Sequence, residues 1–244
     1  MEKQVLSQDS YANAQAVALT KEQIRLEQAS FIAKVYGWMT IALIVTTLVA
    51  WLGAAYEPLP QFILSSRWIL LGFAGAGVLL VRYLSVNINN LSAGKATFLF
   101  LLYAAKVGLM LSIVVYLFTT DSIAVTFAIT AGTFGVMSAY GYYTKKDLTS
   151  IGNIALMALV GFLIASIVNI FFFNDIVYWV LTFLGIIIFV ALVAYDTQKI
   201  KEANVIGNEG TEEDHKEAIM GALILYLDFI NLFLLLLRLF GRRK

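Results

Sequence analysis

The chain has 244 residues, of which 60% are hydrophobic and only 14% are charged, and its formal net charge at pH 7 is +1. Because a soluble domain is usually about 45–50% apolar and about 25% charged, this composition is typical of a polytopic membrane protein. The sequence has no basic stripe with interleaved aromatic residues, so nucleic acid is not expected among its partners. It has no cysteine, which excludes disulfides and thiolate metal sites, and its one histidine, His215, is interpreted as a solvated loop residue.

The N-terminal residues 1–30 are polar and lack the apolar core of a signal peptide, so we expect a cytoplasmic tail that becomes helical after Thr20. Seven apolar stretches follow, each close to the length that crosses the hydrocarbon of a bilayer. They cover residues 32–55, 68–86, 96–118, 122–143, 151–173, 176–200 and 219–240. The sequence therefore predicts an all-α polytopic membrane protein, with one seven-helix transmembrane domain over residues 31–241 and a basic tail over 242–244.

The Lys and Arg residues near the helix ends predict the orientation of the chain. More of them lie on the side of the N-terminus than on the opposite side, which predicts a cytoplasmic N-terminus. The C-terminal GRRK is the exception, because seven full crossings put it outside. A re-entrant last segment would return it to the cytoplasm, but we favour seven crossings because that segment is long enough to span.

Small residues gather in two of the predicted spans, as GFAGAG (72–77) and GTFGVMSAYG (132–141). Small side chains let helix backbones approach closely inside a membrane. We therefore expect both segments to lie at helix–helix contacts.

Few ionisable residues fall inside the predicted spans. They are Arg82, Lys106, Asp196, Asp228 and Arg238. Arg82 and Arg238 are near helix ends, where a long side chain can reach the interface. Lys106 is near the middle of the third span, so it is expected to face the bundle interior and pair with an acid, or to reach a water-filled crevice.

The two aspartates lie on consecutive spans that share one polar loop, so both belong to the cytoplasmic half of the bilayer. Antiparallel neighbouring helices could bring their carboxyl groups together. Two carboxylates away from bulk water cannot both ionise cheaply, so they would share a proton. The protonated pair would hold the helices together, and the ionised pair would repel itself or take a cation. Asn231 falls on the same helix face as Asp228 and could hydrogen-bond it, while a nearby Arg82 or Lys106 would favour ionisation.

Simpler interpretations stay open for two of these features. Asp196 taken alone fits an interfacial residue near a helix end. The acidic loop between the two aspartate helices could gather cations at a cytoplasmic mouth, but a solvated loop is the more ordinary interpretation. The calcium-binding spacing of an EF-hand is missing from it.

Four segments together resemble the Bax inhibitor-1 family in its bacterial branch. They are VYGWMT (35–40), SAYGYYTKKDLTS (138–150), AYDTQKIK (194–201) and GALILYLDFINLFLLLLRLFG (221–241). The resemblance implies a seven-helix bundle in the bacterial inner membrane, with the last helix central and wrapped by the other six. It also implies a pH-sensitive calcium leak channel whose sensor is a hydrogen-bonded aspartate pair, here Asp196 and Asp228. No cofactor and no fixed metal site are expected, although calcium as the transported ion would pass near this pair.

The chain departs from the family pattern on the second span. Calcium-leak members carry an acidic residue and a latching arginine there, whereas this chain has no Asp or Glu between Glu57 and Asp121. Arg82 is on that span in a different local sequence, and Lys106 is a further candidate for the latch or counter-charge.

Three alternative functions remain at this stage. A proton-coupled cation transporter would use the carboxylates as a relay, and a non-conducting protein would modulate membrane stress or turnover. An intramembrane aspartyl protease is not expected, and with it no enzymatic activity. Tyr195 and Asp196 fit such an enzyme, but Asp228 lacks the G-x-G-D context and the chain lacks the downstream P-A-L turn.

Overall fold

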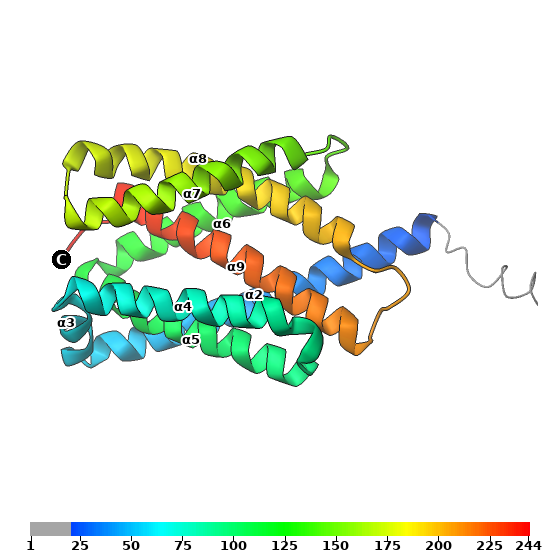
Figure 1. Ribbon diagram of the computed structural model, residues 1–244, viewed down its shortest axis with the longest axis horizontal. Coiled ribbons are helices and arrows are strands. Elements are labelled where there is room, and N and C mark those ends of the chain that lie inside the picture. Colours follow the sequence, from blue (N-terminus) through cyan, green and yellow to red (C-terminus); the bar gives the residue numbers. More distant parts are fainter. Residues whose placement is uncertain (1–20) are drawn as a thin grey trace, which may run out of the picture.

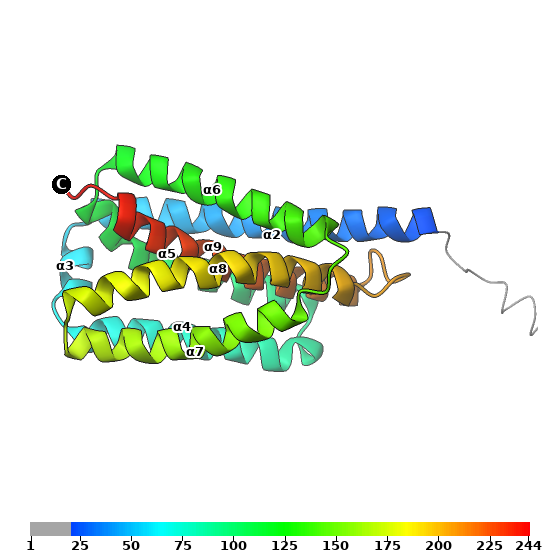
Figure 2. The ribbon, with the colours of Figure 1, turned by 90° about the horizontal axis from the view of Figure 1, so that it is seen from above.

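The computed structural model describes residues 21–244, and nearly all of this part is helical. In chain order the elements are α2 (Lys21–Ala55), α3 (Pro58–Leu64), α4 (Arg67–Asn87), η1 (Ile88–Asn90), α5 (Ala93–Leu117), α6 (Thr120–Tyr143), α7 (Thr149–Phe171), α8 (Asp175–Ala203) and α9 (Glu212–Phe240). Seven of these helices are long and apolar enough to cross a membrane, and they run roughly along one axis (Figures 1 and 2). The predicted seven-span all-α fold is confirmed. Residues 21–30 of the predicted tail form the first turns of α2, and residues 1–20 lie outside the described part.

The last helix crosses the whole bundle. The start of α2 and the α8–α9 loop lie at one end, and the C-terminus lies at the other (Figure 1). The C-terminal residues pair with the α5–α6 turn, where the backbone N–H of Thr119 donates to the carbonyl of Arg242 at 2.9 Å. These positions exclude the re-entrant alternative. We call the end that holds the α8–α9 loop the predicted cytoplasmic end.

Helix α9 is the most buried of the spans. In its most apolar segment 72% of the residues are buried, against at most 39% in any other span. It packs on α2, α5, α6 and α8, while α4 packs mainly on α5 and α7 on α8. Gly221 makes the close approach possible, because a Cβ there would lie 3.0 Å from Ile200 of α8 and 3.2 Å from Val35 of α2. The central position of the last helix is therefore confirmed, with α4 and α7 forming an outer layer.

Helix α9 begins seven residues earlier than the predicted span, at Glu212. The Thr211 hydroxyl accepts a hydrogen bond from the backbone N–H of Asp214 at 3.2 Å, and three acidic residues occupy the first turn. Such a cap and such charges stabilise the N-terminus of a helix. The acidic residues 212–214, for which the sequence favoured a loop, therefore form the capped start of a helix.

The interpretation of His215 as a solvated loop residue is wrong. His215 lies in the first turns of α9 and is half-buried. Its Nε2 is 2.9 Å from the hydroxyl of Thr97, and its ring packs edge-on against Trp38 with centroids 5.3 Å apart. The side chain thus ties α9 to α5 and α2.

Each cluster of small residues contributes one close helix contact. A Cβ at Gly141 of α6 would collide with the backbone of Ala194 in α8. A Cβ at Gly77 of α4 would lie 2.5 Å from the ammonium of Lys106 in α5. The other four glycines of the clusters have no atom within 4 Å of the position that a Cβ would take; they are Gly72, Gly75, Gly132 and Gly135. The expectation of close contact holds at Gly77 and Gly141 and fails at these four.

Candidate functional site

Asp228 and Asp196 face each other between α9 and α8. Asp228 is 5% exposed, and its carboxyl group lies within hydrogen-bonding reach of the half-buried carboxyl of Asp196. The Oδ2 atom of Asp228 is buried with no hydrogen-bond donor among the described residues. Ionised carboxylates are acceptors only, so a hydrogen bond between them requires a proton on one of them. The geometry is therefore compatible with a pair that shares one proton.

Two polar residues that follow Asp196 fix the position of its helix. Thr197 donates a hydrogen bond to the Ser138 hydroxyl of α6 at 3.3 Å. Gln198 accepts from the backbone N–H of Leu148 and donates to the carbonyl of Lys146, both at 2.9 Å. Sequence reasoning missed both roles, although the polar run D-T-Q inside an apolar helix was a signal. These bonds hold α8 against α6 and the α6–α7 loop, directly beside Asp196.

A cavity of about 240 Å³ reaches Asp196 from the predicted cytoplasmic end. Asp196, Lys199 and Glu217 supply its polar lining, and Phe31 of α2 and Met220 of α9 supply part of its apolar wall. Asp228, which is deeper, is not part of the lining. An ion from the predicted cytoplasmic side would therefore meet Asp196 before Asp228.

The other residues expected near the pair lie elsewhere. Arg82 is exposed on α4. The Lys106 ammonium lies against Gly77 and 3.5 Å from the sulfur of Met110. Within residues 21–244 no hydrogen bond or ion pair joins either cation to the aspartates. Asn231 donates to the carbonyl of Leu227 at 2.8 Å, and no hydrogen bond joins it to Asp228 within the described residues.

No group of three or more acidic or histidine side chains that could hold a metal ion occurs in the part of the chain that the structure describes. Two carboxyl groups alone give a cation few ligands, since calcium takes six to eight oxygens in proteins. The pair by itself therefore falls short of such a ligand set.

Comparison with known proteins identifies the family of this chain. The family described as "Inhibitor of apoptosis-promoting Bax1" matches residues 28–244. The chain belongs to the Bax inhibitor-1 family. It is 47% identical to the Inner membrane protein YbhL of Escherichia coli K12 over 223 residues, which cover 91% of this chain and 95% of the relative. It is 40% identical to an uncharacterized protein of Borreliella burgdorferi over 229 residues, covering 93% and 99% of the two chains.

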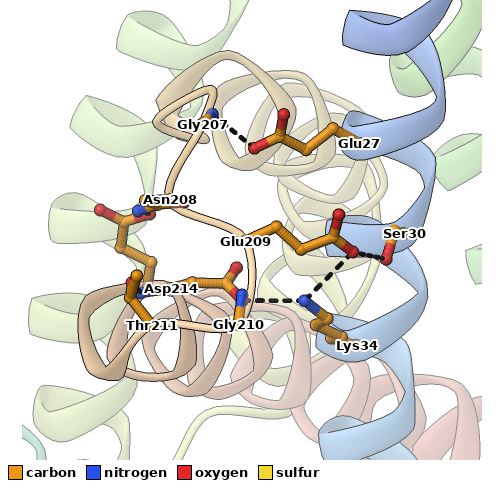
Figure 3. Close-up of polar contacts among 10 residues, drawn as sticks. Glu27, Ser30, Lys34, Gly207, Asn208, Glu209, Gly210, Thr211 and Asp214 are labelled. Atoms are coloured by element: carbon orange, nitrogen blue, oxygen red, sulfur yellow. Dashed lines mark hydrogen bonds and ion pairs between the residues drawn. The ribbon is translucent and has the colours of Figure 1, made fainter.

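In this member of the Bax inhibitor-1 family, polar side chains of α2 bind the loop that joins the two aspartate helices (Figure 3). Lys34 lies 2.8 Å from the Oδ2 of Asp214 and 3.6 Å from Glu209. The Ser30 hydroxyl donates to Glu209 at 2.7 Å, and the backbone N–H of Gly207 donates to the carboxylate of Glu27 at 2.7 Å. We call this set of contacts the α2 clamp.

The loop conformation depends on two glycines. Gly207 and Gly210 adopt φ values of 92° and 81°, which residues with a side chain rarely adopt. The backbone N–H of Gly210 thereby reaches Asp214 Oδ2 at 2.9 Å. The expectation of a solvated loop is confirmed for Glu209, whose side chain is 52% exposed, and is wrong for Asp214, whose side chain is 4% exposed and bound by Lys34.

Replacing Lys34 by methionine is expected to lower the free energy of unfolding. The Asp214 side chain is only 4% exposed and would lose its cation while keeping the hydrogen bond from Gly210, and loss of a partner at a buried polar group costs roughly 1–3 kcal/mol. We expect the lower half of this range because the Lys34 side chain is 35% exposed. Denaturation in mixed micelles measures the change, and Lys95→Met at the same end is the control. Equal stability of the two variants would contradict the α2 clamp.

Proposed function

We propose that this Bax inhibitor-1 homologue is a pH-sensitive cation leak channel of the bacterial inner membrane, with calcium as the principal ion. The buried pair of Asp196 and Asp228 carries the proposal. Family membership and the name of the E. coli relative, an inner membrane protein, support the location.

The gate follows from the chemistry of the pair. With one proton, the two carboxyl groups are joined by a hydrogen bond and keep α8 against α9. Without it, two negative charges face each other in a buried site, which is strongly unfavourable. The helices then separate or accept a cation from the cavity at Asp196. No cation of the chain neutralises the pair in the described residues, so loss of the proton opens the path and flux rises with pH.

Calcium flux into proteoliposomes over a pH series tests this function. Because one proton controls the gate, the flux is expected to rise by up to about tenfold per pH unit across the transition. Protein-free vesicles give the background. Absence of flux above that background at every pH would reject the channel. Calcium movement that drives a matching pH change inside the vesicles would identify a proton-coupled transporter instead.

A further inference from the structure

A long apolar groove opens between α2 and α6 on the side of the bundle. It has a volume of about 860 Å³, with residues 29–48 of α2 and 127–143 of α6 as its walls and Phe229 of α9 at its floor. At 1.5 Å per residue, the walls are roughly 24–28 Å long. Since both walls belong to membrane-spanning helices, the surroundings of the groove are lipid. We propose that this groove binds an acyl chain of an acidic phospholipid, whose phosphate lies at Lys201.

The depth of the groove comes from small residues on both walls. Ala131, Gly135 and Ala139 recur every four residues on α6 and therefore share one helix face, and Ala29 and Ala33 do the same on α2. All five are exposed, and a Cβ added at Gly135 would have no atom within 4 Å. The space is thus left open by the sequence of both helices.

The lining of the groove favours an acyl chain. The rings of Tyr36 on α2 and Phe134 on α6 meet edge-on, with centroids 6.5 Å apart, and the rings of Phe134 and Phe229 have centroids 5.5 Å apart. These ring contacts close the floor of the groove. Above them the lining is mostly apolar and runs along both helices, so a flexible chain of methylene groups can follow it.

The predicted cytoplasmic end of the groove carries positive charge. Lys201 lies 4.6 Å from the centroid of the Tyr142 ring, which is part of the α6 wall. It donates one hydrogen bond, to the carbonyl of Tyr142 at 2.9 Å. An ammonium group has three N–H donors, so two remain for a phosphate oxygen. The exposed Lys145 follows at the end of the same wall, and no Asp or Glu lines the groove in the described residues.

Native mass spectrometry tests the site directly. The protein is incubated in detergent with equal amounts of phosphatidylglycerol and phosphatidylcholine that carry the same acyl chains. We expect one tightly retained lipid per chain, with phosphatidylglycerol preferred several-fold. Gly135→Leu places a side chain in the groove, where its Cβ would meet no atom within 4 Å, and is expected to reduce the retained lipid several-fold; Ala139→Leu provides a second variant with the same expected loss.

Matched controls separate this site from general lipid contact. Gly161→Leu places the same side chain on an open, exposed position of α7 and is expected to leave lipid retention unchanged. Lys201→Gln is expected to reduce the preference for phosphatidylglycerol, whereas Lys95→Gln, outside the groove at the same end, is not. Equal retention by wild type and both groove variants, or equal retention of the two lipids by wild type, would overturn the proposal.

A protein occupant would also overturn it. The chain has no cysteine, so Ala139→Cys creates a single labelling site in the groove. In native membranes we expect this cysteine to react with a lipid-soluble maleimide and to form no protein adduct with a bifunctional cross-linker. A cross-linked second copy or other membrane protein would assign the groove to a helix.

Discussion

Replacing Asp228 by asparagine is expected to abolish the pH dependence of cation flux and to hold the flux at its low, acidic level. The side-chain amide of asparagine can donate a hydrogen bond to Asp196 at every pH. It therefore imitates the protonated pair permanently. Flux in proteoliposomes over the same pH series measures the effect.

Asp228→Ala distinguishes the loss of the hydrogen bond to Asp196 from the loss of the charge of Asp228. Alanine cannot donate to Asp196, so nothing joins α8 to α9 at this point, and we expect high flux at every pH. Asp175→Asn, a change of the same chemistry in the exposed first turn of α8, is the control and should keep the wild-type curve. If Asp228→Asn keeps that curve too, the aspartate pair is not the sensor.

Replacing Gly141 by alanine is expected to be among the most disruptive single-methyl changes in the bundle. The added Cβ would meet the backbone of Ala194, which cannot rotate away as a side chain can. Overpacking of this kind costs typically 1–3 kcal/mol. Because Asp196 is two residues from Ala194, a displaced α8 also shifts the pair, and the pH-flux curve should move with the loss of stability.

Gly132→Ala on the same helix is the matched control. Gly132 is exposed with no atom within 4 Å of a new side chain, and alanine favours a helix over glycine by about 1 kcal/mol. This variant should be as stable as wild type or more so, by unfolding in mixed micelles. Equal stability of the two variants would contradict the close approach of α6 to α8.

The number of spans could be predicted because a bilayer of fixed thickness demands a fixed length of apolar helix. The helix ends could not, since α2 and α9 continue into polar sequence beyond the hydrocarbon. At Thr211 the sequence has a capping residue followed by three acidic residues, which is typical of a helix N-terminus but also of a polar loop. The prediction that His215 lies in a loop is wrong for the same reason.

The two aspartates illustrate how far topology alone can go. Consecutive spans joined by a short loop are antiparallel neighbours in most bundles, so the approach of Asp196 to Asp228 could be expected from their depths. The partners of Lys106 and Asn231 could not be. Each contact depends on how a helix is rotated about its own axis. The sequences of these spans are apolar on nearly every face, so no polar face indicates that rotation.

The amino-acid sequence thus suffices for the membrane class, the seven crossings, the family and the two acids that burial makes costly. Tertiary structure alone decides that Lys34 binds Asp214, that Gly141 meets Ala194, and that α2 and α6 leave a groove open. These contacts join segments far apart in the chain. They depend on the crossing angles and axial offsets of helices, which the packing of side chains across the whole bundle sets.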